Sequence, residues 1–343
     1  MTLKILMIGN LPDKDPRSFG GANTLTLNLY NSLKNSNFFD IEFLQIRTRW
    51  YRFGQLLDYV LHPFRILPKI KSNQIISIHS TWDYHLTIGP FIVLLSNLFK
   101  KKITYHFFGG NFHKRYMSFP VVVKFFLNNT IFKSNVLFFE TKEMVNYFES
   151  IGFKNIYWLP NSRHKPVYES DRVYKKRFVF ISRVTRTKGV DDIISVFNNL
   201  PNDYSIDIYG PLDRKFYSSN SFFGNVKYKG IIKPSEVIEY LKQYDMLLMP
   251  TFHPGEGYPG IFIEAMSLGK PIITTRWNAL HELVDHDKSG ILIPVRSTEA
   301  LRNVILGLDQ AKCSRLVQGS LSKFKQFDLE VIVEKLIVLY LNL

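Results

Sequence analysis

The stretch PTFHPGEGYPGIFIEAMSLGKP, residues 250–271, decides the fold of this chain. The apolar segment DMLLMP (245–250) precedes its glycine-rich centre, and an amphipathic helix follows. A strand, a glycine-rich loop and a helix N-terminus together bind anionic groups, because backbone N–H groups are exposed there and the helix dipole is positive. Glu256 and Glu264 stand at the two ends of the loop, with seven residues between them. The pattern predicts a ligand with central phosphates and hydroxyl groups at both ends, such as a nucleotide-sugar.

These residues resemble the Glu-x7-Glu signature of retaining glycosyltransferases of family 4, which have the GT-B fold. GEGYPGIFIEAM, followed by GKP and the strand PIITT (271–275), looks like sugar transferases that build bacterial surface polysaccharides. The resemblance covers residues 166–300 well and the first half of the chain loosely. An ordinary loop before a capped helix is the alternative, but two prolines and three glycines around two acids exceed what a cap needs.

Strands and helices alternate along the whole chain, which predicts parallel βαβ units. We expect an α/β fold of two Rossmann-like, doubly wound domains that face each other across a cleft, as in GT-B proteins. The predicted bounds are 1–165 for an acceptor-binding domain, 166–320 for a nucleotide-sugar-binding domain and 321–343 for a C-terminal helix that packs back on the first domain. The polar segment 165–176 is the predicted linker. Expected strands are 3–10, 40–48, 75–80, 101–110, 135–141, 155–162, 177–184, 204–210, 225–230, 245–250, 271–275 and 291–295, and expected helices are 20–33, 189–200, 234–244 and parts of 298–343.

Composition limits the class of protein. The chain has 343 residues, of which 45% are hydrophobic, so it can bury the cores of two domains. Cys313 is its single cysteine, which excludes an intrachain disulfide and a cysteine metal cluster and fits a reducing cytoplasm. The N-terminus does not resemble a signal peptide. The apolar stretch 86–99 is too short to cross a membrane, and a buried helix is the better interpretation.

Positive charge is concentrated in the first half. Residues 1–165 carry 21 Lys/Arg and 9 Asp/Glu, whereas residues 166–343 carry 23 and 20. This asymmetry favours an anionic partner: a membrane surface, nucleic acid or a phosphorylated lipid. In residues 110–129, basic and aromatic residues precede an apolar helical stretch that suits an anionic membrane, although a core helix with a basic flank fits equally well. The charge asymmetry favours peripheral contact with the inner face of the membrane.

A second motif lies in ISRVTRTKGVDDII, where Arg183 and Lys188 follow the strand 177–184. It resembles the family's Arg-x4-Lys-Gly element, which holds the donor diphosphate. Two fixed cations stabilise the charge that develops on a leaving diphosphate. Arg186 is less suited to point inward, and Asp191 and Asp192 are typical of a helix start. We find no Asp-x-Asp metal motif in a plausible strand-end loop, and therefore expect metal-independent transfer without a cofactor.

The resemblance assigns roles around the glycine-rich loop. It implies that Glu264 binds the ribose and that backbone N–H groups of Gly260, Ile261 and Phe262 meet the donor phosphate. Glu256 is expected to contact hydroxyls of the donor sugar and to be essential to catalysis, without being assigned as nucleophile or base.

Around the base and the donor sugar, the resemblance places Gly210, Gly230, Gly257 and Tyr258. The usual Gly-x-Gly is replaced by YGPLDR at 209–214, so the base stays open. Glu282 matches the family's Glu-Val/Leu-Val helix, but 277–279 (WNA) replaces the glycines that usually precede it.

In the first half, Gly20 and Gly21 resemble the family's glycine-rich first loop, where acceptor and donor phosphate approach the backbone. Glycines at a helix start permit close approach and positive φ. Asn161, in LPNS, resembles the hinge Pro-Asn-Gly and belongs to the acceptor side. His106, at the end of the strand 101–110, is a catalytic candidate facing sugar or acceptor; a structural role is equally compatible.

These observations predict a retaining hexosyltransferase with a UDP- or GDP-sugar donor and a lipid-diphosphate-linked saccharide acceptor. A nucleotide-sugar epimerase of the same fold needs acid–base groups for C2 chemistry that the sequence does not show. A nucleic-acid binder has no need for Glu256, and nucleic acid is not the expected partner. A catalytically silent GT-B scaffold is the third alternative, and the set of Glu256, Glu264, Arg183 and Lys188 speaks against it.

Overall fold

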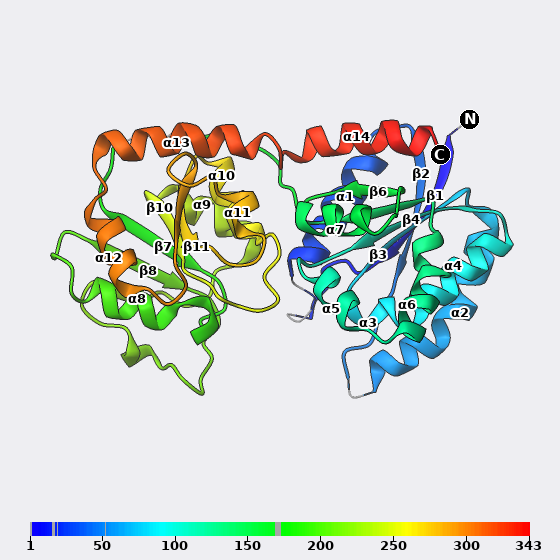
Figure 1. Cartoon of the computed structure of the whole chain (residues 1–343), viewed down its shortest axis with the longest axis horizontal. Helices are drawn as coiled ribbons and strands as arrows, with labels where there is room; N and C mark the ends of the chain where they lie inside the picture. The colour runs from blue at the N-terminus through cyan, green and yellow to red at the C-terminus, as the bar shows by residue number, and fades with distance from the viewer. Residues whose placement is uncertain (1, 16–17, 19, 52, 169–172) are drawn as a thin grey trace. The chain divides into compact units, whose positions relative to one another are not determined.

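The computed structural model describes residues 2–15, 18, 20–51, 53–168 and 173–343. By its contacts the chain forms two compact units, Met1–Ser162 with Leu329–Leu343 (unit 1) and Arg163–Asp328 (unit 2). Figure 1 shows both units with their elements labelled. Part of the predicted linker, residues 169–172, lies outside the described residues.

Unit 1 contains a parallel sheet of six strands in the order β2-β1-β3-β4-β5-β6. The strands are β1 (Leu3–Gly9), β2 (Phe39–Gln45), β3 (Ile75–Ser80), β4 (Lys102–Phe107), β5 (Val136–Phe139) and β6 (Ile156–Trp158). The helices are α1 (Gly21–Lys34), α2 (Gly54–Ser72), α3 (Trp82–His85), α4 (Ile88–Leu98), α5 (Phe112–Ser118), α6 (Val121–Asn128), the 3₁₀ turn η2 (Ile131–Lys133), α7 (Lys142–Ser150) and α14 (Leu329–Leu341).

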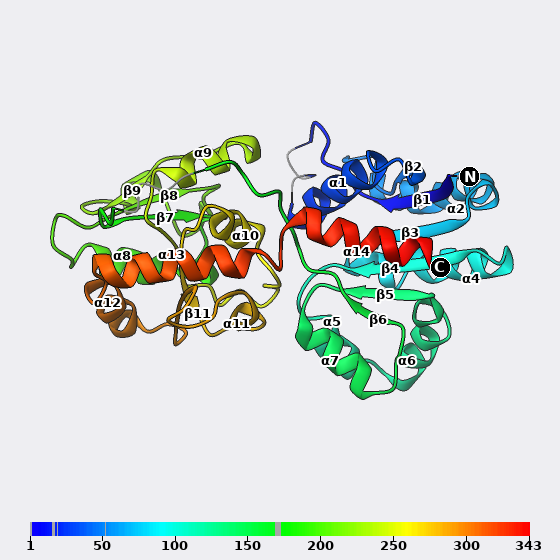
Figure 2. The ribbon, with the colours of Figure 1, turned by 90° about the horizontal axis from the view of Figure 1, so that it is seen from above.

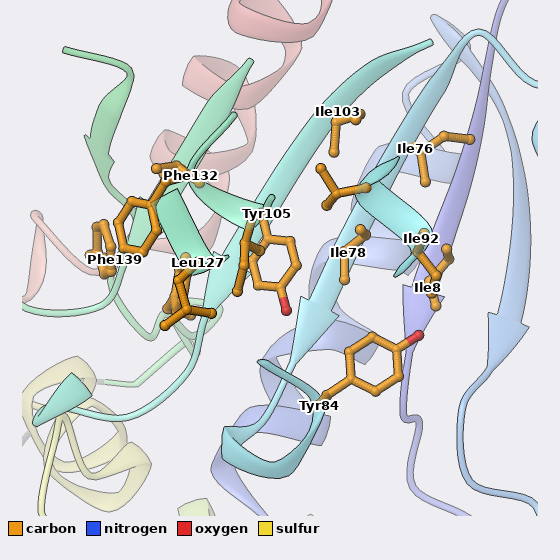
Figure 3. Close-up of a cluster of buried hydrophobic side chains, with 14 of the residues drawn as sticks. Ile8, Ile76, Ile78, Tyr84, Ile92, Ile103, Tyr105, Leu127, Phe132 and Phe139 are labelled. Carbon is orange, nitrogen blue, oxygen red and sulfur yellow. The ribbon is translucent and has the colours of Figure 1, made fainter. Parts of the chain in front are cut away.

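Alternating side chains of the strands build two cores in unit 1. Leu6 and Ile8 of β1 pack toward one layer, whereas Ile5 and Met7 pack toward the other. The first core is rich in aromatic rings, and Figure 3 shows Tyr105 and Phe139 of neighbouring strands within it. In the second core, α1 and α14 pack against each other and against the sheet.

The last helix joins the N-terminal sheet through a polar contact inside this second core. The hydroxyl of Tyr340 in α14 lies 3.0 Å from Ser77 Oγ in β3, and both residues are buried. Figure 2 shows α14 crossing the strands of unit 1 next to α1. The chain thus returns to its first unit after completing the second.

Unit 2 repeats the architecture with the strand order β12-β11-β10-β7-β8-β9, again fully parallel. The strands are β7 (Arg177–Ile181), β8 (Ser205–Tyr209), β9 (Val226–Tyr228), β10 (Met246–Met249), β11 (Ile272–Thr275) and β12 (Gly290–Ile293). The helices are α8 (Val190–Phe197), α9 (Val237–Lys242), α10 (Gly260–Ser267), α11 (Leu280–Leu283), α12 (Thr298–Leu306) and α13 (Gln310–Phe324), with 3₁₀ turns η3 (Arg186–Lys188), η4 (Ser219–Ser221) and η5 (Pro234–Glu236). The predicted α/β class of two doubly wound parallel sheets is confirmed.

Two helices of unit 1 differ from expectation. The sequence did not indicate α2, because Pro63 and Pro68 lie inside it and normally interrupt a helix. The stretch 86–99 contains α4, but the prediction that this helix is buried is only half right. Ile92 and Val93 are fully buried, whereas the outer face is exposed, with Leu98 74% accessible. In the described part of the chain, no helix has the length and apolarity needed to cross a membrane.

Candidate active site

The loop after β10 holds a buried ion pair. Glu256 and Lys188 are 7% and 6% exposed, and Lys188 Nζ donates to Glu256 Oε2 at 2.5 Å. The hydroxyl of Thr251 donates to the same carboxylate oxygen at 2.9 Å. The two motifs read from the sequence, Lys-Gly after β7 and the glutamate loop after β10, therefore meet at the carboxyl ends of neighbouring strands, where ligands bind in doubly wound sheets.

The glycine after Lys188 is required by the backbone. Gly189 has φ +77°, and a Cβ there would lie 2.3 Å from the carbonyl oxygen of Pro250. A side chain would both strain the backbone and push the two loops apart. The dipeptide Lys188–Gly189 thus fixes the lysine against the glutamate loop.

Residues 277 and 278 support this loop from the following strand–helix connection. Trp277 Nε1 donates to the His253 carbonyl at 2.8 Å, and Asn278 Nδ2 donates to the Glu256 carbonyl at 3.3 Å. His253 is held by a contact of 3.2 Å between its Nδ1 and Thr187 Oγ1. Burial, together with nearby Lys188, lowers the pKa of His253. The side chains that replace the family's glycines therefore brace the loop.

The start of α10 presents backbone donors. Its N-cap, Pro259, has no N–H and makes no side-chain cap. The Phe262 N–H donates to the Pro259 carbonyl at 3.0 Å, whereas Gly260 and Ile261 have no hydrogen-bond acceptor for their N–H groups among the described residues. Two unpaired N–H groups at the positive end of a helix form a site for an anion.

Glu264 lies one turn further along α10 and has a partner that the sequence did not suggest. Arg163 Nε donates to Glu264 Oε1 at 2.7 Å, and both side chains are largely buried. The backbone of Arg163 is itself fixed, since its N–H donates to the Phe327 carbonyl at 3.1 Å. The acid predicted to bind ribose is therefore held in place by an arginine from the start of unit 2.

The remaining donor-side candidates follow the strands β7, β8, β9 and β10. Arg183 is exposed, in contrast to Lys188. Arg186 turns away, as expected, because it pairs with Asp191 at 3.3 Å and stacks over Phe216. Gly210 has φ +135°, and its N–H donates to the Gly230 carbonyl at 2.8 Å, so these two glycines pack together. Tyr258, next to Gly257, donates through its hydroxyl to Glu282.

In unit 1, Gly20 and Gly21 begin α1 without a capping side chain. Neither adopts a positive φ, so the conformational freedom expected of them is not used. A Cβ on Gly21 would lie 3.7 Å from Asn161 Nδ2, whereas one on Gly20 would have no neighbour within 4 Å. Gly21 and the buried Asn161 are therefore neighbours in unit 1.

His106 lies inside the second core of unit 1. Its ring is 1% exposed and stands 4.3 Å from Phe108 and 5.5 Å from His79, measured between ring centroids. Burial, with a smaller contribution from His79, holds the pKa of His106 well below its ordinary value. A neutral ring packed among aromatic groups fits the structural alternative better than direct contact with a substrate.

A pocket of about 220 Å³ opens at the carboxyl ends of β1, β2 and β3, and it was not foreseen from the sequence. Arg47 stacks on Trp50 at 4.1 Å along one wall. On another wall, Asp83 accepts hydrogen bonds from Tyr59 at 2.6 Å and from Thr81 at 3.1 Å. The lining residues are Asn10, Asn23, Ile46, Arg47, Trp50, Gln55, Tyr59, Thr81, Asp83 and Tyr84.

This pocket lies at a topological switch point, because β2 and β3 flank β1 on opposite sides. Aromatic rings beside amide, carboxylate and guanidinium groups are suited to a sugar ring, which presents apolar C–H faces and peripheral hydroxyls. Its residues are scattered between positions 10 and 84 without a spaced motif, so only the fold reveals them.

Comparison with known proteins agrees with this geometry. Residues 175–310, all within unit 2, match the family described as glycosyl transferases group 1. The amylovoran biosynthesis glycosyltransferase AmsK of Erwinia amylovora is 28% identical over 148 residues, covering 40% of this chain and 36% of that protein. The putative colanic acid biosynthesis glycosyltransferase WcaL of Escherichia coli is 27% identical over 150 residues, covering 40% of this chain and 37% of that protein. These alignments span little more than a third of either relative.

Solved structures resemble the chain along nearly its whole length. Anabaena HepE in complex with UDP has a TM-score of 0.76 at 15% identity, covering 99% of this chain and 100% of HepE. The lipopolysaccharide outer core galactosyltransferase WaaB, in its apo form, has a TM-score of 0.67 at 15% identity over 97% of both chains. The fold is therefore that of the GT-B glycosyltransferases. Within it, the region of unit 2 that carries both loop motifs is similar to group 1 glycosyltransferases.

Proposed function

We propose that this chain is a retaining glycosyltransferase of family 4. It moves a hexose-type sugar from a UDP- or GDP-sugar to a lipid-diphosphate-linked saccharide in the synthesis of a surface polysaccharide, at the cytoplasmic face of the membrane. The observation that carries the proposal is the buried Lys188–Glu256 pair next to the unpaired N–H groups of Gly260 and Ile261. Cations, backbone donors and a carboxylate stand together at one sheet edge, as a nucleotide-sugar requires.

The donor's groups can be assigned to these residues one by one. The N–H groups of Gly260 and Ile261 meet the diphosphate, and Lys188 and Arg183 supply positive charge to it. Glu264, held by Arg163, accepts hydrogen bonds from the ribose hydroxyls. Glu256, held by Lys188 and Thr251, accepts hydrogen bonds from hydroxyls of the transferred sugar.

The reaction breaks the bond between the sugar C1 and the diphosphate oxygen and forms one between C1 and an acceptor hydroxyl oxygen. The proton of that hydroxyl goes to the departing diphosphate, whose new charge the cations and the helix N-terminus stabilise. Attack on the face that the diphosphate leaves retains the configuration at C1. The donor is a substrate, and no cofactor or metal is part of this proposal. Full activity in EDTA is the expected result; a loss that Mg²⁺ restores would disprove metal independence.

In unit 1, we assign the pocket around Asp83 and Trp50 to the sugar ring of the acceptor. Asp83 accepts hydrogen bonds from ring hydroxyls, and the Arg47–Trp50 stack covers one face of the ring. Gly21 and Asn161 belong to the same unit and keep their assignment to the acceptor side.

Isothermal titration calorimetry with UDP, GDP and ADP tests the donor site. One nucleotide should bind, and Glu264→Ala and Arg183→Ala should each weaken its binding about tenfold or more, as expected for the loss of a charge-assisted contact. Arg302→Ala, an exposed arginine on α12, is the matched control and should bind like the parent. A well-folded protein that binds none of the three would favour the silent scaffold.

A further inference from the structure

Three neighbouring helices of unit 1 have apolar residues on their outer faces. α2 packs on α4, and η2 packs on both α4 and α6, so the three helices form one layer over the sheet (Figure 1). The outward residues recur at intervals of three or four along α2 and α4, and on α6 they form two adjacent pairs one turn apart, which places them on one side of each helix. We call this set the apolar face: Leu56, Val60, Phe64 and Leu67 of α2, Phe91, Leu94 and Leu98 of α4, and Val121, Val122, Phe125 and Phe126 of α6.

The apolar face is not part of either core. Phe64, Val121 and Phe125 are 77%, 82% and 69% exposed, whereas the inward side of the same layer is fully buried, as at Ile66 of α2. A surface helix in water normally has polar residues on its outer side. The eleven exposed aliphatic and aromatic side chains of the apolar face indicate a surface that is covered by a partner.

The charges around the apolar face identify the partner's chemistry. Residues 54–133, which contain the three helices, include ten lysines and arginines but only two acids. Asp58 is buried and pairs with Arg49, so Asp83, which accepts from Tyr59 at the pocket, is the one exposed acid among the described residues of this range. Exposed Lys100 and Lys102 follow α4, and exposed Lys133 follows α6. The surface is therefore apolar at its centre and cationic around it.

We propose that unit 1 docks on an anionic lipid bilayer through α2, α4 and α6, which lie in the plane of the interface. Phe64 and Phe125 enter the boundary between headgroups and acyl chains, while Lys100, Lys102 and Lys133 contact lipid phosphates. A nucleic acid would not cover exposed Leu and Val side chains. A protein partner does not require a surface whose charges are so uniformly positive. The sequence pointed to residues 110–129 alone, and the structure extends the surface to α2 and α4.

The role of this docking surface rests on the proposed function, because a lipid-linked acceptor reaches the protein from a membrane. The pocket assigned to the acceptor sugar adjoins the same layer. Gln55 and Tyr59 of α2 line the pocket, and the next residues along the helix, Leu56 and Val60, belong to the apolar face.

Flotation of the full chain with vesicles tests the docking surface. The protein should float with phosphatidylcholine vesicles containing 30% phosphatidylglycerol at 50 mM NaCl, and much less with pure phosphatidylcholine or at 500 mM NaCl. Phe64→Glu with Phe125→Glu should reduce the bound fraction at least tenfold, as should reversing the charges of Lys100, Lys102 and Lys133 to glutamate. Val338→Glu is the matched control, because Val338 is 60% exposed on α14, in the other layer of the same unit.

Three outcomes overturn the proposal: absence of flotation by the parent chain, equal flotation of the parent and the α2/α6 variant, or an apolar face that instead joins two copies. Light scattering after gel filtration detects the last, since the parent would be dimeric and the Phe64/Phe125 variant monomeric. Thermal melting and nucleotide calorimetry on every variant show that fold and donor site are unchanged. Nucleotide binding without flotation refutes the docking surface alone, whereas flotation without nucleotide binding refutes the proposed function alone.

Discussion

The two units share one architecture but differ in the polar groups that they bury most often. Unit 2 buries charge in pairs, with Lys188 against Glu256 and Arg163 against Glu264. Unit 1 has one comparable pair, the buried Asp58 with the partly exposed Arg49. Its other buried polar groups include several histidines among aromatic rings, such as His85 next to Tyr105, Phe107 and Phe112. The comparison shows that the doubly wound sheet does not determine which groups it buries. In the proposed function the paired charges of unit 2 face a charged ligand, whereas the neutral rings of unit 1 belong to its cores.

Acid should destabilise unit 1 more than unit 2, and this is the largest effect that we expect. Burial lowers the pKa of His62 and His79 to about 4 and that of His85 to about 3, and it also holds the pKa of His106 well below its ordinary value. The unfolded chain takes up these protons near pH 6.5. The stability contributed by the neutral rings is therefore complete above that pH and is lost as the pH falls toward 4. Each histidine costs unit 1 about 1.4 kcal/mol per pH unit in this window.

Hydrogen exchange followed by mass spectrometry at pH 7 and pH 5 measures this loss for each unit separately. Between pH 7 and pH 5, peptides of unit 1 should lose more protection against exchange than peptides of unit 2, after correction for intrinsic exchange rates. His62→Gln, which keeps a partner for the Tyr84 hydroxyl, should reduce the pH dependence by about one proton. His281→Gln, at an exposed site in unit 2, should leave it unchanged. Parallel loss of protection in both units would contradict the comparison.

Separating the buried pair of unit 2 should come next in size. Lys188→Met leaves the Glu256 carboxylate buried without its cation, which should lower the free energy of unfolding by about 3 kcal/mol. Adding Glu256→Gln to this variant should recover much of the loss, because the uncompensated charge is then gone. Urea unfolding of the two single variants and the double variant measures the coupling. Additive losses would mean that the two groups do not interact.

Two glycines give a third, matched test of the comparison. Gly189→Ala in unit 2 should cost about 2 kcal/mol, because φ is +77° and the new Cβ would press on the Pro250 carbonyl. Gly20→Ala in unit 1 should change the stability by less than about 0.5 kcal/mol, since its φ is extended and no atom lies within 4 Å of the new Cβ. Thermal unfolding of both variants compares them. Equal effects would show that the loop after β7 tolerates a side chain.

The sequence predicted the fold because strand and helix periodicities are local signals that tertiary packing did not override. It also indicated Lys188–Gly189 and the loop from Glu256 to Glu264, which the structure brings together at the ends of β7 and β10, because both are contiguous motifs tied to backbone geometry. The sequence did not indicate Arg163, because its partner Glu264 lies 101 residues away and no spacing rule links the two residues.

Unit 1 was less predictable for a related reason. An apolar residue at helical spacing looks the same whether it faces a core or the solvent, so Phe64 and Leu98 could be assigned only once the layer was known. The prolines inside α2 also concealed the helix itself. Likewise, a strand-end histidine suggests catalysis until the fold shows that a helix covers that side of the sheet, as α14 does over the core around His106.

The smallest expected effect concerns the pocket of unit 1. Its measurement distinguishes acceptor binding from donor binding. Asp83→Asn keeps the size of the side chain but removes the charge that accepts hydroxyl hydrogens. It should raise the KM for a lipid-linked acceptor extracted from the native membrane about fivefold, as for the loss of one such hydrogen bond. The affinity for the nucleotide, which the proposal assigns to unit 2, should stay constant. Asp40→Asn, at an exposed site on β2, is the control. A change in nucleotide affinity without a change in acceptor KM would place the acceptor elsewhere and leave the pocket without its proposed role.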